Sequence, residues 1–583
     1  MHPLSYQRSG KGDLAIRRGP WEYIPDLATA NNWSSWTKPG TKTAAKPGLF
    51  PPGEDPGETI HRRLARTTGK YPRQPPRMKP TLLAIALATL APLSAAVRLP
   101  SFISDHMVLQ RDGAVPVWGW ADPGERVTVS IAGQQQSTKA GADGKWSLKF
   151  DKLAADGPQT MTVKGSNEIT VRDVLIGEVW LASGQSNMQM QVNGVNNAKG
   201  EIDQAKFPEI RMFSVERKTA ETPQAECGGK WEVCSPETVA RFSATAYFFG
   251  RDLHQTLKVP VGLINASWGG TPIEGWTSLE AQQSLPALAP SLASWKTKVA
   301  APFDDEQAKI RHAKQMEIWK NQSAKAKAAG KRPPQQPRLL LSPRLQPHRP
   351  GNLFNGMIAP LVPYAIRGAI WYQGEGNAGG AAKLYTEQLP LMIRDWRKRW
   401  GQGDFHFASV QLPGFKKPVD DPGAASGWAL IREAMLKSRS LPNTGMAIVI
   451  DAGDANNIHP KDKQTVGKRL GRWARAEVYG EKIPSSGPLP SGHEVKDGSI
   501  VLKFTHTDGG LKSKEAELKG FAIAGSDRKW VWATARIEGD TVIVSSPDVK
   551  TPVAARYAWA DNPAAPLVNG AGLPASPFRT DDW

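Results

Sequence analysis

Residues 174–191 read VLIGEVWLASGQSNMQMQ, an apolar run that ends abruptly in a polar turn. The apolar part has the length of a buried strand, and Gly184 leads the turn that follows it. A strand that breaks into such a turn can hold a serine hydroxyl clear of the backbone, where a substrate reaches it. The stretch therefore predicts a buried strand with Ser186 as a candidate nucleophile at its carboxyl end. The alternative is an ordinary turn serine.

A histidine near the end of the same region completes a candidate pair. Residues 456–460 read NNIHP and precede a helical stretch at 463–478. Nucleophilic acyl transfer needs a serine and a base that takes its proton, so the fold must bring His459 to Ser186. The alternative for a lone His-Pro pair is a plain loop.

Apolar strands alternate with helical stretches over residues 173–482, which predicts an α/β domain with a parallel sheet. In such sheets, ligands bind beyond the carboxyl ends of the strands. Glycine-rich turns at 268–272 and 373–377 follow two of the predicted strands, as the Ser186 turn follows the first. We expect a helix at 243–256 and strands at 174–181, 259–267, 366–372, 405–412 and 445–450.

Two other regions alternate apolar and polar residues between Gly and Pro turns, as antiparallel strands do. Residues 97–172 predict an N-terminal antiparallel β domain, and residues 483–583 predict a C-terminal one. Within the second, residues 530–537 are expected to form one strand. A Lys- and Ala-rich helical stretch followed by a Pro-rich segment, at about 280–350, is expected to be a basic insertion on the surface of the α/β domain.

The beginning of the chain differs from the rest. Residues 1–77 are rich in Pro, Gly, Arg and Lys, lack periodicity, and predict a disordered or spurious extension. Residues 78–96 have a basic start, an apolar core and small residues at the end, the pattern of a secretory signal peptide. We expect translation to start at Met78 and the protein to be periplasmic or secreted. The alternative is a real disordered extension ahead of a membrane-associated helix, although the apolar core is too short for a permanent membrane span.

The formal net charge of +19 is concentrated in two segments. Residues 1–77 carry +7 and residues 296–349 carry +9, so the rest of the chain is close to neutral. Without a concentrated basic stripe, no nucleic-acid partner is expected. His459 has no neighbouring His or Cys at ligand spacing, and no phosphate-binding loop of the required form is present, so neither a metal nor another cofactor is expected.

The two cysteines, Cys227 and Cys234, lie close together in the sequence. In an exported protein they either close a small disulfide loop or remain thiols, and the sequence leaves both open. They supply too few ligands for a structural zinc site.

Three motifs together resemble those of the sialate O-acetylesterases, a family of SGNH hydrolases with a flavodoxin-like catalytic domain. They are Gly184-Gln185-Ser186-Asn187-Met188, Trp371-Tyr372-Gln373-Gly374-Glu375 and Ile458-His459-Pro460-Lys461-Asp462-Lys463-Gln464. The similarity extends to residues 99–110, 350–358 and 572–579, and covers about residues 98–580 apart from the basic insertion. It implies a flavodoxin-like α/β core with a parallel sheet, flanked by the two antiparallel β domains.

The resemblance also implies a role for each residue of the site. Ser186 would attack an acetyl carbonyl, and His459 would take its proton and later activate water. The implied oxyanion donors are the backbone N–H of Ser186, a backbone N–H of Gly269 or Gly270, and the side-chain amide of Asn377. The alternatives are a tight turn for the two glycines and helix capping for Asn377. The candidate substrate-binding residues are Gln185, Gln373 and Glu375, of which Glu375 alternatively buttresses its turn.

The chain departs from the family's pattern at two positions. Members often carry Asp two residues before the histidine, where this chain has Asn457, preceded by Asn456. Since an amide cannot stabilise imidazolium as a carboxylate does, either Asp454 or Asp451 supplies the charge, or the enzyme runs on a weakened triad or a Ser-His dyad. Asp454 is the candidate third member, with a loop carboxylate as the alternative. The second departure is Gly376, where serine is common.

These features predict a serine esterase that removes O-acetyl groups from sugars, sialic acids first, through an acetyl-enzyme. A rival within the enzymes is deacetylation of acetylated xylan or another polysaccharide. A third hypothesis, from another class, is a non-catalytic carbohydrate-binding protein with a decayed hydrolase core, which Asn457 keeps open. The expected partner is an acetylated sugar or glycan, and the sequence does not fix the oligomeric state.

Overall fold

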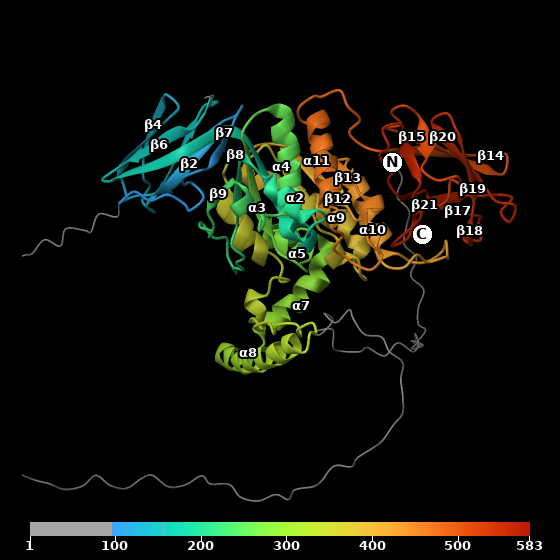
Figure 1. The fold of residues 1–583 in the computed structure, drawn as a ribbon, viewed down its shortest axis with the longest axis horizontal. Helices are drawn as coiled ribbons and strands as arrows, with labels where there is room; N and C mark the ends of the chain where they lie inside the picture. The colour runs from blue at the N-terminus through green and yellow to red at the C-terminus, as the bar shows by residue number, and fades with distance from the viewer. Residues whose placement is uncertain (1–95, 155–156) are drawn as a thin grey trace, which may run out of the picture. The chain divides into compact units, whose positions relative to one another are not determined.

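The structure, a computed structural model, describes residues 96–154 and 157–583. The predicted extension at 1–77 and all but the last residue of the predicted signal peptide lie outside the described residues. The central feature of the fold is a parallel sheet in the order β13-β12-β11-β7-β10-β8, which β9 extends antiparallel beyond β8 (Figure 1). Its strands are β7 (Glu168–Gly184), β8 (Phe207–Ser214), β9 (Trp231–Cys234), β10 (Val261–Ser267), β11 (Gly368–Tyr372), β12 (His406–Gln411) and β13 (Thr444–Ile448). The predicted α/β domain with a parallel sheet is confirmed.

Four long helices pack in two pairs. α4 (Ala244–Leu257) packs against α11 (Lys463–Glu477), and α9 (Tyr385–Trp400) packs against α10 (Gly427–Ser438). α10 and α11 both contact the edge strand β13 and its neighbour β12, and the two helix pairs cover opposite faces of the sheet. Side-chain caps fix where these helices begin: Ser243 accepts from the N–H of Ala246, and Asp462 from that of Thr465.

Strand β7 belongs to two parts of the molecule. Its first half pairs antiparallel with β6 (Gln159–Lys164), whereas its second half lies between β10 and β11 and pairs with both in parallel. Burial follows this division, because the side chains from residue 174 onward are buried and those before it are mixed. Fully buried parallel strands carry continuous apolar runs, and half-buried antiparallel strands do not. The predicted boundary at 172–173 therefore falls inside one strand.

Antiparallel strands form on both sides of the core. In the N-terminal β region, β2 (Val115–Trp120) pairs with β5 (Lys145–Phe150), and β3 (Arg126–Ile131) pairs with β4 (Gln134–Lys139) and β6. In the C-terminal region, one sheet has the order β14-β15-β20-β19 and another the order β18-β17-β21-β23. These strands are β14 (Leu489–Lys496), β15 (Ser499–Thr505), β17 (Phe521–Ala524), β18 (Trp530–Trp532), β19 (Thr534–Glu538), β20 (Thr541–Ser545), β21 (Ala554–Tyr557) and β23 (Phe578–Arg579).

The single strand predicted at 530–537 is wrong. The segment forms β18 and β19, which pair with β17 and β20 in different sheets. Between them, the N–H of Ala533 donates to the carbonyl of Phe521, so the chain changes sheet at this residue. An apolar segment with strand character does not reveal which partner each half takes.

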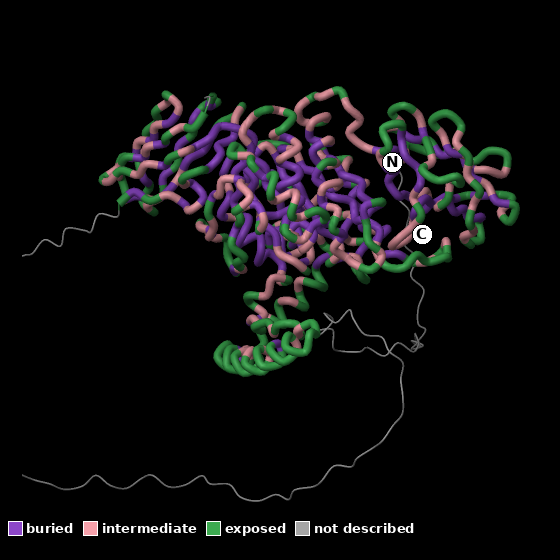
Figure 2. The backbone as a smooth tube through the Cα atoms, viewed as in Figure 1, coloured by how far each residue is buried: buried purple, intermediate pink, exposed green. Residues whose placement is uncertain are grey.

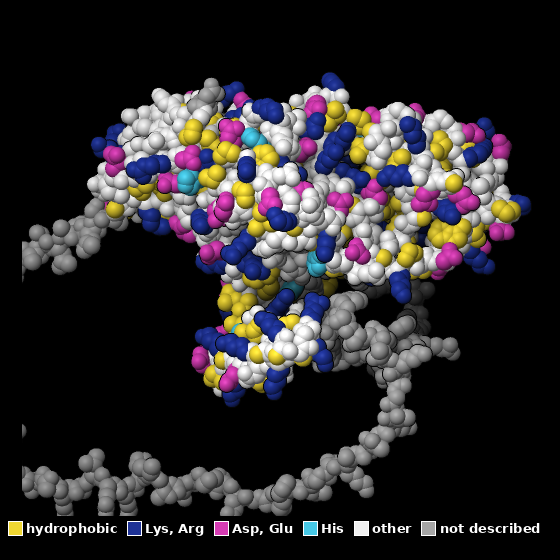
Figure 3. All heavy atoms as spheres, viewed as in Figure 1, with side chains coloured by type: hydrophobic (Ala, Val, Ile, Leu, Met, Phe, Trp, Pro, Cys, Tyr) yellow, Lys and Arg dark blue, Asp and Glu magenta, His cyan; other side chains and the backbone are white. Residues whose placement is uncertain are grey.

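The basic insertion is helical, as predicted. It contains α6 (Leu279–Gln283), α7 (Ala289–Ala300) and α8 (Asp305–Ala328), and then a stretch without regular structure up to residue 342. α8 is exposed along most of its length (Figure 2), and Lys and Arg side chains stand out on its visible face (Figure 3). Within the described residues, no helix is both long enough and apolar enough to cross a membrane.

The two cysteines are free thiols, which settles the question that the sequence left open. Cys227 and Cys234 are both buried and form no disulfide. Burial raises the pKa of each thiol to about 12, so neither carries the thiolate that reactive cysteines need.

Candidate active site

A tight turn after β7 presents Ser186. Gly184 has a φ of 139°, and a Cβ added there would lie 2.2 Å from the carbonyl oxygen of Tyr372 in β11. Only glycine fits this close approach of the two strands. The N–H of Gln185 donates to the same carbonyl at 2.9 Å, and Ser186 then opens the short helix α1 (Ser186–Gln189) with its side chain half-buried. The predicted strand, turn and serine are therefore in place.

The fold brings the His459 loop to this turn. Asn187, the residue after Ser186, donates from its Nδ2 to the carbonyl of Ile458, the residue before His459, at 3.0 Å. His459 is half-buried beside α11. Ser186 and His459 make no direct hydrogen bond in the part of the chain that the structure describes. Hydrogen bonds between catalytic groups are often long before substrate binds, so the pairing of Ser186 with His459 stays a prediction.

Burial and a nearby cation act on the imidazole. Burial lowers the pKa of His459 below its usual 6.5, and the charge of Lys463 lowers it further. Lys463, at the start of α11, is fully buried, and burial lowers the pKa of its ammonium group to about 7. Both effects keep the imidazole neutral near pH 7, the form that a general base requires.

Three polar residues before His459 bond to groups other than its imidazole, two of them to the loop backbone. The Oδ1 of Asn457 accepts from the N–H of His459 at 3.0 Å, and the Oδ1 of Asp454 accepts from the N–H of Asn456 at 2.9 Å. Asp454 is exposed. Asp451 forms ion pairs with Arg469 and Lys514, which bring its pKa down to about 2 although burial raises it.

Among residues 96–154 and 157–583, none of these three side chains hydrogen-bonds to the imidazole. The role of Asp454 as third member of a triad stays a prediction.

The glycine turn after β10 lies against the nucleophile. A Cβ added at Gly269 would lie 3.2 Å from the Cβ of Ser186, so this backbone lies against the Ser186 turn, and its role as an oxyanion donor stays a prediction. The N–H of Gly269 donates to the Oε1 of Gln189 at 2.7 Å. Gly270 has a φ of 77°, and its carbonyl accepts from the Nε2 of His348 at 2.9 Å. His348, near the end of the basic insertion, thus contacts the glycine turn after β10.

A buried polar network fixes the third turn. The Nε2 of Gln373 donates to the Oε1 of Gln185 at 3.2 Å and to the Oδ1 of Asn377 at 2.8 Å. Asn377 donates from its Nδ2 to Glu274 in α5 (Ile273–Trp276) at 3.0 Å, which leaves one amide hydrogen for an oxyanion. Gln185 and Gln373 are buried and hold the turns together, so their assignment as substrate-binding residues stays a prediction.

Glu375 also faces inward. Its Oε1 accepts from the Nδ2 of Asn187 at 2.5 Å, as expected of a residue that buttresses the turn. The roles of Asn187, Gln189 and Lys463 were not predicted from the sequence. Asn187 and Lys463 stand inside the quoted motifs, but only the fold shows that their side chains meet.

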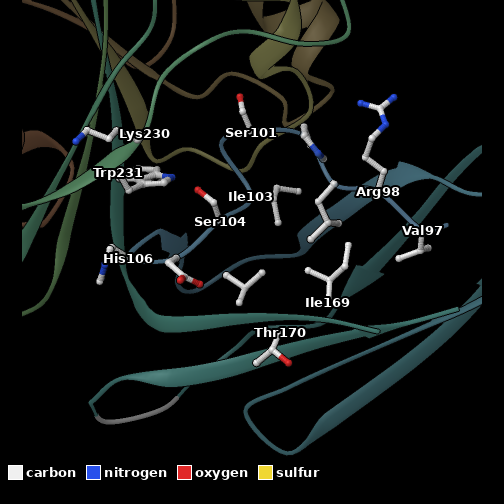
Figure 4. A pocket seen from close by; sticks show the side chains of 14 residues that line it. Val97, Arg98, Ser101, Ile103, Ser104, His106, Ile169, Thr170, Lys230 and Trp231 are labelled. Atoms are coloured by element: carbon white, nitrogen blue, oxygen red, sulfur yellow. The ribbon is translucent and has the colours of Figure 1, made fainter. Parts of the chain in front are cut away.

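A cavity of about 660 Å³ lies elsewhere, between the N-terminal β region and β9 (Figure 4). Its lining includes Arg98, His106, Ile169 and Trp231, and none of the candidate catalytic residues. The arrangement that can perform acyl transfer is therefore the set of turns at the carboxyl ends of β7, β10 and β11, where open α/β sheets bind ligands.

Comparison with known proteins agrees with this arrangement. Residues 176–298 match the family described as carbohydrate esterase, sialic acid-specific acetylesterase. The human sialate O-acetylesterase is 32% identical over 85% of this chain and 95% of its own length, and the mouse protein is 34% identical over 82% and 94%. The crystal structure of a carbohydrate acetylesterase from Xanthomonas citri is 36% identical, covers 84% of this chain and 100% of its own, and superposes with a TM-score of 0.71. With its predicted motifs meeting at one edge of the sheet and relatives matched over nearly their full length, the chain belongs to the sialate O-acetylesterase family.

Proposed function

We propose that this protein is a serine esterase that hydrolyses O-acetyl esters on sugars, sialic acids first. The observation that carries the proposal is the meeting of the Ser186 turn, the Gly269 turn and the His459 loop at the carboxyl edge of the sheet. Family membership supports the same reaction, because the curated relatives are sialate O-acetylesterases.

The residues divide the reaction between them. Ser186 attacks the acetyl carbonyl carbon while His459 takes the hydroxyl proton, and His459 then gives that proton to the departing sugar oxygen. In the second half, His459 draws a proton from water, which attacks the acetyl-enzyme and releases acetate. The N–H groups of Ser186 and Gly269 and the amide of Asn377 are the donors for the oxyanion, with Gly270 as the alternative to Gly269. Asp454 is the candidate carboxylate for the imidazolium, and a dyad of Ser186 and His459 is the alternative, which the exposed position of Asp454 favours.

Acetylated plant polysaccharide is the second candidate substrate. The similar protein from Xanthomonas citri is described as a carbohydrate acetylesterase, without mention of sialic acid. Both substrates present an acetyl ester on a sugar hydroxyl, so the same chemistry serves either one. Acetate release from acetylated sialic acids, acetylated xylooligosaccharides and aryl acetates ranks them.

The test of the reaction itself is Ser186→Ala. We expect the variant to lose at least about 10³-fold in kcat on p-nitrophenyl acetate, because no other group can form the acetyl-enzyme. Equal rates for the variant and the wild type would eliminate the esterase and leave a sugar-binding protein with a decayed core.

Export is part of the proposal. The signal-peptide pattern at 78–96 supports a periplasmic or secreted protein that starts at Met78. N-terminal sequencing of protein from its native host tests it: a mature start near Val97 supports export, and recovery of peptides from the first residues contradicts it.

A further inference from the structure

A buried chain of contacts joins Glu375, Asn187 and Lys463. The Oε1 of Glu375 accepts from the Nδ2 of Asn187 at 2.5 Å, and the Oδ1 of Asn187 accepts from the Nζ of Lys463 at 2.7 Å. A single amide therefore lies between a carboxylate and an ammonium group. The three residues come from three separate parts of the chain: the turn after β11, helix α1 and the first turn of α11.

Two members of this bridge of Glu375, Asn187 and Lys463 contact the segments that carry the candidate catalytic residues. Asn187 follows Ser186 directly, and its Nδ2 also donates to the carbonyl of Ile458. The Nζ of Lys463 donates to the carbonyl of Pro460 at 2.7 Å, so the ammonium group holds the loop just after His459. Asn187 and Lys463 thus hydrogen-bond to the backbone just before and just after His459, and Asn187 is itself the residue that follows Ser186.

Burying the charged and polar side chains of this bridge costs free energy of folding. The side chains of Asn187 and Lys463 are fully buried, and the Oε2 of Glu375 is buried without a hydrogen-bond partner among the described residues. The ammonium group lies 5.3 Å from the centre of the Tyr372 ring. Well-packed apolar side chains commonly stabilise a core as well as a buried ion pair does, so stability alone does not account for this arrangement.

We propose that Lys463 and Glu375 are positioning residues that act through Asn187 to hold the Ser186 turn and the His459 loop in register. The inference rests on the proposed function, since it takes Ser186 and His459 as the acyl-transfer pair.

The charges around the bridge define what it does to the base. Lys463 faces Glu375 from the turn after β11 and Asp462 from the N-cap of its own helix, and these carboxylates oppose the effect of burial on its pKa of about 7. Burial raises the pKa of Glu375, which Asn187 and Lys463 counteract. Because His459 titrates below 6.5, Lys463 is still protonated in that range, and its charge disfavours imidazolium.

The experiment compares Lys463→Met, Lys463→Arg, Glu375→Gln and the double variant with the wild type. The matched control is Lys461→Met, which removes the same charge from an exposed side chain in the same segment. We expect Lys463→Met and Glu375→Gln each to lower kcat on p-nitrophenyl acetate at least tenfold, with KM changed less than threefold. The double variant of Lys463→Met and Glu375→Gln should recover part of the loss in kcat, because it leaves no unpaired buried charge. Lys461→Met should behave as the wild type.

A measurement without turnover separates this inference from the proposed function. In the full chain with ¹³C-labelled histidine, the ring signal of His459, assigned with His459→Gln, should titrate at a higher pH in Lys463→Met, and at the wild-type position in Lys461→Met and Lys463→Arg. An unchanged titration together with an unchanged kcat in folded Lys463→Met would overturn the positioning role. If Lys463→Met does not fold, wild-type kcat in Glu375→Gln overturns it instead. Absence of Ser186-dependent hydrolysis in the wild type refutes the esterase, whereas the titration still reports the coupling.

Discussion

The side-chain Oε1 of Gln189 accepts a hydrogen bond from the backbone N–H of Gly269 at 2.7 Å, so this proposed oxyanion donor already has a partner. Helix α1 carries Gln189 three residues after Ser186, so the group that presents the nucleophile also supplies the acceptor. With Gly269 as the proposed oxyanion donor, a substrate carbonyl would have to displace this acceptor first. We therefore expect each turnover to break one hydrogen bond of the free enzyme.

Replacing Gln189 by Leu should open the donor while keeping the bulk of the side chain. We expect kcat/KM on p-nitrophenyl acetate to rise about two- to tenfold, the factor that one neutral hydrogen bond represents. The control is Gln191→Leu, because Gln191 is exposed, and it should leave kcat/KM unchanged. A fall in kcat/KM in Gln189→Leu would mean that Gln189 assists the reaction instead of competing with the substrate.

The pH profile should show a base that stays neutral in mildly acidic solution. Burial, and then the charge of Lys463, lower the pKa of His459 below 6.5. Since the neutral imidazole is the active form, kcat/KM should decline on the acid side with a midpoint below pH 6.5, as the pH falls through the lowered pKa. An acid limb centred above pH 6.5 would contradict the burial of this imidazole.

Asp454→Asn distinguishes a triad from a dyad. The Asp454 carboxylate is exposed and accepts from the N–H of Asn456, so we expect kcat to fall by less than about tenfold. In serine proteases with a Ser-His-Asp triad, replacing the carboxylate by an amide costs about 10⁴ in turnover. A loss of about 10³ or more would assign the third place to Asp454. Thermal unfolding of the variant provides the check that its loop is intact.

Gly184→Ala should disrupt the nucleophile turn. The new Cβ would lie 2.2 Å from the Tyr372 carbonyl, at a φ of 139° that only glycine adopts freely. We expect the free energy of unfolding to drop by at least about 2 kcal/mol, and activity with it. Gly379→Ala is the control, because a Cβ at that position meets no atom within 4 Å. Urea unfolding followed by tryptophan fluorescence measures both variants.

Glu178 is the centre of an ion-pair cluster, and we expect the stability of the sheet to depend on it. It is fully buried in β7 and accepts from Arg367 at 2.7 Å and from Arg111 at 2.6 Å. Burial raises the pKa of Glu178, but the two guanidinium groups outweigh it, and the net pKa lies below 4.5. The stabilisation is therefore complete above that unfolded-state value and is lost as the pH falls through the lowered pKa.

We expect Glu178→Gln to reduce the free energy of unfolding at pH 7 by up to about 3–5 kcal/mol, because it removes the buried carboxylate that the half-buried side chains of Arg111 and Arg367 bind. Glu494→Gln, which breaks an exposed pair with Lys503, should change it by less than about 1 kcal/mol. Equal effects in chemical denaturation would refute the cluster's importance.

Periodicity predicted the core well where apolar runs are continuous. The strand expected at 259–267 is β10, and the helix expected at 243–256 is α4 with Ser243 as its cap. It failed where one strand serves two environments, as in β7, or where one run changes sheet, as at Ala533. In these places the partners of a strand, rather than its own residues, decide where it begins and ends.

For the site, the motifs identified the turns but not the contacts between them. Gln189 and Gly269 are 80 residues apart, and Asn187 and Lys463 are 276 apart, so no local pattern pairs their side chains. Lys463 opens a helix, where a lysine is ordinarily exposed, and only the packing of α11 against the nucleophile turn buries it. The buried amide of Asn187 can be recognised as a bridge only when both charges beside it are in place.

The second half of β7, from Val174 to Gly184, restricts how the sequence of this protein can change. Side chains along a strand alternate between faces, so deleting one residue between Val174 and Gly184 would turn every later side chain to the opposite face. That reversal would carry Ser186 away from His459 even though neither residue had been altered. Loss or gain of residues is therefore tolerable in the connecting loops before β7, while the strand itself has to keep its length for the hydrolase to survive.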